Sequence, residues 1–418
     1  GEEVPKGRKK KVLILMSDTG GGHRASAMAI TAAMEELFPG ETEAEVVDVM
    51  VDVIGGMYAK FPSQYSFTAK HPMLWRAVYY VGGFPPTRFA CEKVTDLLAY
   101  KKIETFLAKS APDIIVSVHP LTQTLPLKAL NNLCPGAARP PFVTVVTDLA
   151  AAHPTWFHPA ADLVIVPTPA LARAARKARV PAAAVKTIGL PVRPAFWAAP
   201  KTGWASRLRG RGGGAAVTHG EKAAARRKVG IDAERKSVLV VGGGDGVGGL
   251  EKTATSLIEK LAKAEDEAKT NGTPELGPNA QVVVVCGKNE KIRKNLEAVD
   301  WPIPVTVQGF VSNMDEWMKA SDAIVTKAGP GTIEEALISG LPIVLSAYLP
   351  GQEYGNIDYV TRAGVGEFQK KPEKIAGTIQ RWFSDEKLLA EMSEKARKLG
   401  KPTATYEIAQ TIGELLFK

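Results

Sequence analysis

The sequence contains the same local pattern twice, and this repeat limits the folds that the chain can adopt. The apolar run KVLILM is followed by the glycine-rich SDTGGGH and then by the alanine-rich RASAMAITAAMEELF, which has the apolar spacing of a helix. Further along, SVLVV is followed by GGGDGVGG and a second helical stretch. A buried strand, a glycine loop and a helix in this order are typical of an α/β domain with a parallel sheet.

Each pattern opens a series of apolar runs that predict further strands. EVVDVM, DIIVSVH, FVTVVTDL and LVIVPT follow the first, and QVVVVCG, VTVQGF, DAIVTKAG and PIVLSAY follow the second. The 418 residues are enough for two hydrophobic cores. We therefore predict an α/β protein with two doubly wound, Rossmann-like domains whose glycine loops lie at the carboxyl ends of the strands. If these faces oppose each other, we expect the ligand to bind in the cleft between the domains.

The composition changes between the two series, and this change sets the predicted domain boundaries. Residues 200–228 are rich in Gly, Ala, Arg and Lys and poor in large apolar residues, which is typical of a linker or insertion. The first domain is then predicted over residues 1–199 and the second over residues 229–400. Residues 401–418 include the amphipathic TATYEIAQTIGELLF, which we expect to form a helix that crosses back to the first domain.

The composition also argues against several classes of protein. The three cysteines, Cys91, Cys134 and Cys286, are far apart and predict neither a disulfide framework nor a metal site. No run of about 18 apolar residues predicts a membrane-spanning helix, and the basic start GEEVPKGRKKK lacks the apolar stretch of a signal peptide. The net charge of +9 indicates attraction to a polyanion. Without a helix-turn-helix, zinc-finger or RNP-like signature, we expect anionic lipid rather than nucleic acid.

Two glycine-rich segments in the second half are candidates for phosphate binding. Residues 242–249, GGGDGVGG, let a ligand approach the backbone beside a helix N-terminus, although a tight turn without a ligand is the alternative. TKAGPGTIEEALISGLP is more specific, because residues 329–331 open a helix whose free N–H groups suit a diphosphate. A glutamate one turn into this helix can accept hydrogen bonds from the ribose hydroxyls. Alternatively the acidic residues balance the helix dipole, for which Glu334 is the better candidate than Glu335.

His23, at the end of SDTGGGH, is the first candidate for proton transfer. A glycine triplet would hold its ring at the start of the predicted helix, at the carboxyl edge of the sheet. A helix N-terminus disfavours the imidazolium form and lowers the pKa, so a neutral ring that can accept a proton is expected. The alternative is that His23 is structural, as a lone histidine more often is.

Asp148 is the second candidate for proton transfer. It follows the strand FVTVV in the segment VVTDLAAAHPTWFHP, and an acid at a strand end of an α/β sheet is a reasonable general base. The alternative is that Asp148 caps the next turn. His153 and His158 of the same segment lack the spacing of metal ligands, so we predict no zinc site.

The order of the motifs is more specific than any one of them. SDTGGGHRASA, TDL with HPTWFH, GLPVRP, GGGDG, KAGPGTIEEA and GQEYGN follow one another. In these motifs the chain resembles the plant and algal monogalactosyldiacylglycerol synthases of glycosyltransferase family 28, from about Lys10 onward and apart from the insertion. The resemblance implies the GT-B fold, with an acceptor-binding first domain and a UDP-sugar-binding second domain. It also implies an inverting galactosyltransferase that converts UDP-galactose and diacylglycerol into a β-galactolipid, without a required cofactor or metal.

The resemblance places the donor site mainly in the second half of the chain. Glu335 would hold the ribose, and Gln352 and Glu353 of GQEYGN would contact the sugar hydroxyls. The backbone around Phe310 and Val311 would meet the uracil. The remaining residues assigned to the UDP-sugar site, most of which would face the diphosphate, are Gly243, Gly244, Lys327, Gly329, Pro330, Gly331, Thr332 and, as a nearby cation, Arg193.

The acceptor site is expected in the first half. His23 matches the essential glycine-loop histidine of the family and Asp148 matches the acid of its TDL motif, and either could remove the acceptor proton. Residues 58–88 mix aromatic, aliphatic and basic side chains, as segments at a membrane surface do, while a pair of core helices with basic edges is the alternative. The residues predicted to contact the acceptor or the membrane are Gly21, Gly22, Phe61, Tyr65, Trp75, Arg76, Tyr79 and Trp156.

Several alternatives stay open. UDP-glucose or UDP-N-acetylglucosamine could replace UDP-galactose, because Gln352 and Glu353 do not by themselves distinguish epimers, and a non-catalytic protein that binds nucleotide sugars or anionic lipids is a more distant alternative. The basic residues within 200–228 form either a solvated linker or an extra contact with anionic lipid. From the resemblance we expect activation by phosphatidylglycerol or phosphatidic acid, peripheral association with the chloroplast envelope, and a homodimer as one option. The first residues look like the trimmed start of a mature chain, so the location rests on the resemblance alone.

Overall fold

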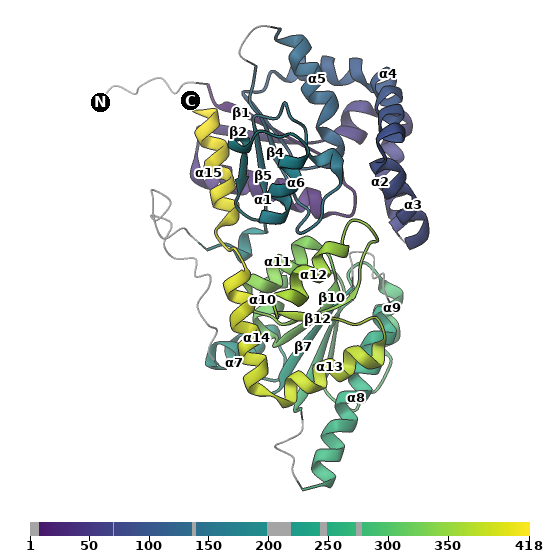
Figure 1. The fold of residues 1–418 in the computed structure, drawn as a ribbon. Coiled ribbons are helices and arrows are strands. Elements are labelled where there is room, and N and C mark those ends of the chain that lie inside the picture. The colour runs from purple at the N-terminus through teal and green to yellow at the C-terminus, as the bar shows by residue number, and fades with distance from the viewer. Residues whose placement is uncertain (1–7, 70, 136–138, 199–218, 243–248, 273–277) are drawn as a thin grey trace, which may run out of the picture. The chain divides into compact units, whose positions relative to one another are not determined.

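The computed structural model describes residues 8–69, 71–135, 139–198, 219–242, 249–272 and 278–418. The chain divides into two compact units, each built on its own six-stranded parallel sheet (Figure 1). Unit 1 comprises Gly1–Arg211, Pro350–Gln352 and Thr403–Lys418, and unit 2 comprises Gly212–Leu349 and Glu353–Pro402. The predicted class, an α/β protein with two Rossmann-like domains, is confirmed.

The sheet of unit 1 has the strand order β2-β1-β3-β4-β5-β6, and every neighbouring pair is parallel. Its four central strands are short apolar runs that are mostly buried, as parallel strands covered by helices must be, whereas the two edge strands are partly exposed. Their bounds are β1 (Lys10–Met16), β2 (Thr42–Asp48), β3 (Ile114–Ser117), β4 (Phe142–Val145), β5 (Leu163–Val166) and β6 (Val185–Thr187). The helices are α1 (Gly22–Leu37), α2 (Phe61–Ala69), α3 (Pro72–Gly83), α4 (Pro85–Ser110), α5 (Thr124–Leu133), α6 (Pro169–Lys177) and α15 (Ala404–Leu416).

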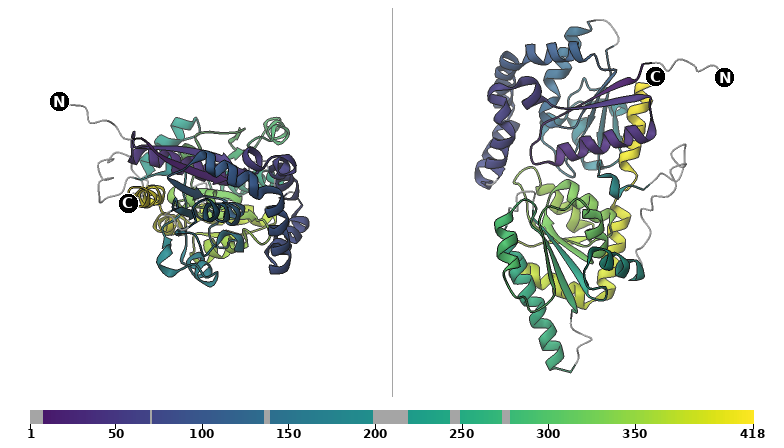
Figure 2. Two further views of the ribbon diagram at one scale, coloured as in Figure 1. Left: turned by 90° about the horizontal axis from the view of Figure 1, so that it is seen from above. Right: turned by 180° about the vertical axis from the view of Figure 1, so that it is seen from behind.

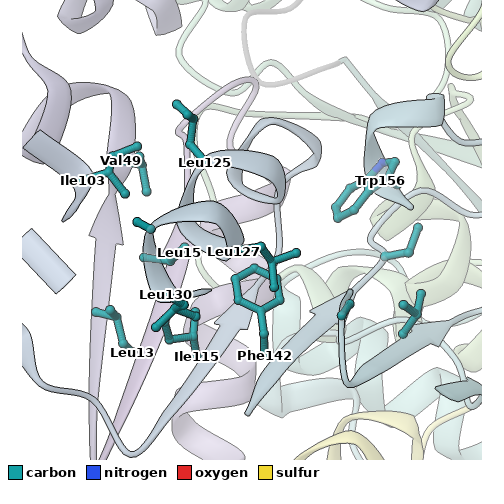
Figure 3. Close-up of a cluster of buried hydrophobic side chains, with 14 of the residues drawn as sticks. Leu13, Leu15, Val49, Ile103, Ile115, Leu125, Leu127, Leu130, Phe142 and Trp156 are labelled. Atoms are coloured by element: carbon teal, nitrogen blue, oxygen red, sulfur yellow. The ribbon is translucent and has the colours of Figure 1, made fainter. Parts of the chain in front are cut away.

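One hydrophobic core of unit 1 lies between the sheet and helices α4 and α5. Figure 3 shows Leu13 and Leu15 from β1 close to Ile115 from β3 and Phe142 from β4. Leu127 and Leu130 of α5 complete the cluster, and all six side chains are buried, which stabilises the sheet by removing apolar area from water. Alternate residues of β1 are also buried, so both faces of this strand are covered.

Helix α15 packs along α1, although the residues of unit 2 lie between the two helices in the sequence (Figures 1 and 2). The Tyr406 hydroxyl donates to the Glu36 carboxylate, and the rings of Phe38 and Phe417 lie 5.3 Å apart between centroids. A Cβ on Gly413 would lie 2.1 Å from Phe38 Cζ, so the helices approach at a position where only glycine fits without rearrangement. Helices α2 and α3 and the start of α4 lie at one side of unit 1 in both figures, while the rest of α4 packs on α5 and the core.

The sheet of unit 2 has the order β12-β11-β10-β7-β8-β9 and is also parallel throughout. Its strands are β7 (Lys236–Val241), β8 (Ala280–Val285), β9 (Val305–Gln308), β10 (Ala323–Lys327), β11 (Ile343–Ala347) and β12 (Gly366–Phe368). The helices are α7 (His219–Val229), α8 (Leu250–Thr270), α9 (Glu290–Glu297), α10 (Met314–Ala320), α11 (Pro330–Ile338), α12 (Tyr354–Arg362), α13 (Pro372–Ser384) and α14 (Glu386–Leu399). Helices α8 and α13 pack against each other over β7, β8 and β10.

Helix α7 departs from the predicted linker over residues 200–228. Residues 199–218 lie outside the described part of the chain, but residues 219–228 belong to a helix of unit 2. Arg226 is buried, and its guanidinium donates to Asp322 Oδ2 at 2.5 Å. Lys222 Nζ lies 2.7 Å from the other oxygen of Asp322. Both predictions for this segment, a solvated linker and a contact with anionic lipid, are therefore wrong for Arg226, because Asp322 neutralises its charge inside unit 2.

Candidate active site

The strand order of unit 1 reverses at β1, which pairs with β2 on one side and β3 on the other. The connections that leave β1 and β3 therefore diverge at the carboxyl edge of the sheet, and ligands of open α/β sheets bind at such a switch point. The loop after β1 ends at Gly21 and leads into Gly22 and His23 in the first turn of α1, and the segment after β3 carries Val118 and His119. The structure thus brings the predicted glycine loop to the position where a ligand is expected.

The glycine loop has a backbone that favours glycine at two successive positions. Gly20 and Gly21 have φ angles of 77° and 75°, in the left-handed region, and α1 begins at the next residue. A Cβ on Gly20 would lie 3.3 Å from Cε1 of Tyr65, so the Tyr65 ring rests against the loop backbone. A residue predicted on the acceptor side thus contacts the loop that carries His23.

His23 is held in one tautomer by the end of β3. Its Nδ1 lies 2.8 Å from the carbonyl oxygen of Val118, which can only accept, so Nδ1 carries the proton and Nε2 has the free lone pair. The hydroxyl of Thr147, after β4, lies 3.0 Å from the same nitrogen. Burial lowers the pKa of His23 to about 4, although its hydrogen bond to Val118 and the charge of Asp18 act in the opposite direction. The lowered pKa that the sequence predicts is present, but burial is its main cause.

Asp148 lies beyond the end of β4, where it is buried. The indole Nε1–H of Trp156 donates to its Oδ2 at 2.6 Å. Trp156 itself is 0% exposed and belongs to the hydrophobic core, as Figure 3 shows. The predicted contact of Trp156 with a membrane surface is therefore wrong, and this side chain instead supports Asp148.

The aromatic residues predicted on the acceptor side form a partly buried row. Tyr65 and Trp75 meet edge to face at 4.9 Å between ring centroids, Trp75 and Tyr79 lie 6.3 Å apart, and Tyr79 packs on His153 at 5.0 Å. Phe61 is half-buried against the core of unit 1. These side chains therefore lie on the faces of the helices that pack against the protein, not on the faces exposed to solvent.

A different set of side chains in α2, α3 and α4 is exposed, and we call it the apolar helical surface. Met73 is 87% exposed and Leu97 is 86% exposed, and Leu97 lies beyond the segment that the sequence singles out. Arg76 is exposed beside the ring of Tyr80, so a basic group lies next to this surface. The surface consists of Phe67, Met73, Leu74, Val78, Tyr80, Val81, Phe84, Phe89, Val94, Leu97 and Leu98. None of the helices in the described ranges is long and apolar enough to span a bilayer.

Unit 2 has its own switch point, because β7 pairs with β10 on one side and β8 on the other. A small cavity at the carboxyl ends of these strands is lined by Gly242 after β7, Thr253 of α8, Lys327 of β10 and Ser346 of β11, among others. The predicted Gly243 and Gly244 follow directly but lie outside the described residues. Lys327 is therefore the predicted donor-site residue that this cavity includes.

Lys327 and Glu353 form an ion pair with an Nζ–Oε1 distance of 2.7 Å. Glu353 is only 3% exposed, and its other oxygen accepts the backbone N–H of Leu349 at 2.8 Å. Removing Lys327 would leave a buried carboxylate without its cation, which is costly. The structure thus joins two predicted donor-site residues at the carboxyl edge of the second sheet.

The predicted phosphate-binding helix is α11, which begins at Pro330 after Gly329. Its first turn contains no acidic residue, so Glu334 and Glu335 do not act as first-turn partners of the dipole. Both are buried, and Glu334 Oε1 accepts the backbone N–H of Lys401 at 2.7 Å. Burial raises the pKa of Glu334 to about 7. Glu334 therefore has a structural role, as the sequence favours, but through a different partner.

The other predicted donor-site residues are placed as follows. Gly331 is exposed and Thr332 half-buried in the first turn of α11, while Phe310 is 75% exposed after β9 and Val311 is half-buried. Arg193 belongs to unit 1, where its guanidinium lies 5.4 Å from the centroid of the Phe196 ring. Gln352 is also grouped with unit 1, whereas Glu353 is grouped with unit 2.

Three polar residues near His23 are missing from the sequence-based prediction: Thr19, His119 and Thr147. His119 follows β3 in the run DIIVSVH, and Thr147 directly precedes Asp148. A polar residue at the end of an apolar strand is the signal that could have indicated both. Within the described residues, no group of three or more His, Cys, Asp or Glu side chains has the arrangement of a metal site.

The sequence is similar to characterised families over nearly its whole length. The family model of monogalactosyldiacylglycerol (MGDG) synthase matches residues 23–192, and that of the glycosyltransferase family 28 C-terminal domain matches residues 237–412. Monogalactosyldiacylglycerol synthase 1 of Arabidopsis thaliana, named chloroplastic, is 40% identical over 98% of this chain and 72% of its own length. The chloroplastic enzyme of that name from Spinacia oleracea is 40% identical over 97% of this chain and 73% of its own.

Solved structures share the fold at much lower identity. MurG of Acinetobacter baumannii has a TM-score of 0.57 at 16% identity and covers 97% of this chain and 99% of its own. Anabaena Alr3699/HepE, solved with UDP, has a TM-score of 0.53 at 16% identity over 98% of this chain and 99% of its own. These likenesses confirm the two-domain glycosyltransferase fold, and the identity to the plant enzymes confirms the resemblance seen in the motifs. The chain belongs to the monogalactosyldiacylglycerol synthase family.

Proposed function

We propose that this protein is an inverting galactosyltransferase that transfers galactose from UDP-galactose to the free hydroxyl of sn-1,2-diacylglycerol. The names of its relatives support the product, a monogalactosyldiacylglycerol. The observation that carries the proposal is His23, a buried neutral imidazole with an unprotonated Nε2 at the switch point of unit 1. Such a group is suited to take the proton of an alcohol.

In the proposed reaction, the hydroxyl oxygen of diacylglycerol forms a bond to the anomeric carbon while the bond from that carbon to the diphosphate oxygen breaks. The hydroxyl proton passes to Nε2 of His23, and UDP leaves with the electron pair of the broken bond. One displacement converts the α-linked donor into a β-galactoside. We assign the base to His23 rather than Asp148, because Oδ2 of Asp148 already accepts the indole N–H of Trp156.

We assign the UDP-sugar to unit 2. The small cavity beside Lys327 and the N-terminus of α11 would face the diphosphate, whose leaving charge the helix N–H groups stabilise. Glu335 would hold the ribose, and the buried Glu353 would accept hydrogen bonds from the sugar hydroxyls. The UDP bound to the Anabaena protein of the same fold supports this class of donor.

We assign the acceptor to unit 1. The indole N–H of Trp75 is buried and has no partner among the described residues, and the Trp75 ring packs on Tyr65, which rests against Gly20. An ester oxygen of diacylglycerol would satisfy this donor. The apolar helical surface would enter the interface of a bilayer, with Arg76 drawn to anionic headgroups such as phosphatidylglycerol. The chloroplastic names of the relatives support the chloroplast as location, and the envelope and the homodimer stay predictions.

The experiment that tests the function uses vesicles of phosphatidylcholine and phosphatidylglycerol that contain dioleoylglycerol. Labelled UDP-galactose, UDP-glucose and UDP-N-acetylglucosamine are supplied separately, and the lipid product and its anomeric configuration are determined. We expect β-galactolipid from UDP-galactose at a rate at least tenfold above the other donors. His23→Ala should abolish product, since general-base catalysis contributes roughly 10²–10⁴-fold, while its affinity for UDP stays within about twofold. Preference for another donor, or a retained α linkage, would sink the proposal.

A further inference from the structure

His119 lies next to His23 and is held in the opposite tautomer. Its Nδ1 accepts the backbone N–H of Leu121 at 3.2 Å, so Nε2 carries the proton. That Nε2–H donates to the hydroxyl oxygen of Thr19 at 3.0 Å. The two imidazoles meet edge to face, with centroids 4.5 Å apart and planes at 68°. Burial and the nearby His23 both lower the pKa of His119, so the ring is neutral at the pH of the reaction.

The contacts of His119 link the end of β3 to the glycine loop. Val118 fixes the Nδ1–H of His23 through its carbonyl oxygen, and the adjacent residue fixes Thr19, four positions before His23. Residues 118–119 therefore orient both the imidazole of His23, which would accept the proton, and the glycine loop that precedes it. Thr19 directly precedes Gly20 and Gly21, which have few backbone restraints of their own. Its bond to His119 therefore adds to the bond from the Asp18 backbone N–H to Asp48 in fixing the loop.

We propose that His119 is a positioning residue for His23: it anchors the glycine loop through Thr19 and keeps the proton-accepting Nε2 of His23 in place. This inference rests on the proposed function, in which His23 is the base. His119 does not supply charge, because its two hydrogen bonds define a neutral ring. Its effect is therefore geometric, and a misplacement of about 1 Å in a catalytic group can cost roughly 10²-fold in rate.

The backbone of His119 has its own anchors, so its side chain can be changed selectively. The carbonyl oxygen accepts hydrogen bonds from Thr122 Oγ1 at 2.9 Å and Gln123 Nε2 at 3.0 Å. Gln123 is in turn fixed by the hydroxyl of Thr144, which donates to Oε1 at 2.7 Å. These contacts do not involve the imidazole, so they are expected to survive its replacement.

Two amide substitutions separate the two hydrogen bonds of the ring. His119→Asn places an oxygen near the position of Nδ1 and keeps the bond from Leu121, but it does not reach Thr19. His119→Gln places its amide nitrogen near the position of Nε2 and restores the donor to Thr19. Thr19→Val removes the same bond from the other side and leaves His119 unchanged. We expect His119→Asn and Thr19→Val to lower kcat about 10- to 100-fold with little change in KM for UDP-galactose, and His119→Gln to recover to within about threefold of the native rate.

The pH profile gives a readout that a purely structural role would not move. The groups that face His23 are Asp18 from its own loop, Val118 and His119 after β3, Thr147 after β4, and Trp156, and Asp18 is the charged one among them. The substitutions leave Asp18 in place. Water admitted by His119→Asn would hydrate His23, so the acid limb of kcat should move from about pH 4 toward 6.5. His119→Gln should keep the native limb.

A measurement without turnover separates this inference from the proposed function. Ring ¹⁵N shifts of histidine-labelled protein report the tautomer of His23, assigned through the signal lost in His23→Gln. We expect the Nδ1–H tautomer in the native protein and in His119→Gln, and a mixture in His119→Asn and Thr19→Val. Unchanged tautomer in both of these variants, or equal loss of kcat in His119→Asn and His119→Gln, would overturn the positioning role. A native protein that makes no galactolipid would overturn the function instead, while the tautomer experiment still stands. Melting temperatures show whether a variant is folded. If His119→Asn does not fold, Thr19→Val tests the same hydrogen bond.

Discussion

The indole N–H of Trp156 points at Oδ2 of Asp148, 2.6 Å away, and both side chains are buried. A neutral donor orients a carboxylate without cancelling its charge, whereas a lysine or arginine would pair with it. The bond from Trp156 therefore fixes the direction of the Asp148 carboxylate, next to Thr147, which contacts His23. Trp156 also packs 6.0 Å from the His23 ring, between centroids, so it supports both candidate catalytic groups.

Trp156→Phe should lower kcat about tenfold, because a hydrogen bond to a charged group contributes about 1.5–3 kcal/mol and the ring volume is largely kept. Steady-state assays at saturating UDP-galactose measure the effect. Trp197→Phe is the matched control, since the indole of Trp197 donates to the backbone oxygen of Val192 in the same unit. Equal losses of kcat in the two variants would show that the bond to Asp148 has no special role.

The rate should be nearly independent of pH between about 5 and 8 and fall below pH 4, because the pKa of His23 is about 4 and the neutral ring is the active form. The same shift affects stability: the folded pKa lies below the ordinary 6.5, so the contribution of neutral His23 is present above pH 6.5 and is lost as the pH falls through 4. The pH dependence of kcat/KM tests this directly. His158→Gln should leave the profile unchanged, and an acid limb at pH 6.5 in the native protein would contradict the burial of His23.

Glu353→Gln should weaken binding of UDP-galactose at least tenfold while affinity for UDP stays within about twofold, since the proposed partner of Glu353 is the sugar and a hydrogen bond to a charged group is worth about 1.5–3 kcal/mol. Isothermal titration with the two ligands separates the effects. Glu316→Gln is the control in the same unit, because Glu316 pairs with Lys228 of α7 at 2.7 Å. Equal weakening for both ligands would place Glu353 at the nucleotide or in the fold rather than at the sugar.

Met73→Glu and Leu97→Glu should each reduce binding to phosphatidylglycerol-containing vesicles at least tenfold, because each places a charge on the apolar helical surface. Vesicle flotation measures the bound fraction. Val299→Glu introduces the same charge at an exposed apolar position of unit 2 and controls for net charge. If all three variants bind alike, membrane association does not use this surface.

Glu334→Gln should stabilise the protein relative to the native chain by an amount that grows as the pH rises from about 4.5 to 8. The pKa of Glu334 is raised to about 7 by burial, so its favourable neutral form is lost as the pH passes through 7, whereas glutamine stays neutral and can still accept from Lys401. Melting temperatures at pH 5, 6, 7 and 8 give the trend. The exposed Glu394→Gln is the control, and an equal, constant gap in both variants would contradict a charge effect at Glu334.

The sequence predicts the two sheets well because most strands are short apolar runs that can be recognised from their own residues alone. The run KVLILM is β1 almost residue for residue, and GPGTIEEALI marks the start of α11. Helix α7 is different, because its basic residues look solvated until Asp322 is known to lie beside them. Arg226 and Asp322 are 96 residues apart, and composition carries no information about such a pair.

The site divides in the same way. His23 is found from the sequence because the glycine loop that holds it is local. His119 and Thr147 follow different strands, and they reach His23 only because β1, β3 and β4 are ordered side by side in register. Trp156 illustrates a further limit, since an aromatic side chain suits a membrane surface and a protein core equally until its burial is known.

The packing of α15 on α1 has a consequence for synthesis on the ribosome. Strands β1 to β6 emerge before any part of unit 2, but the residues that cover α1 are made only after unit 2 is complete. Until then the α1 face around Phe38 is open to water and to other nascent chains. The unit that is translated first is thus the last to finish folding, and a chaperone that shields α1 would act during that interval.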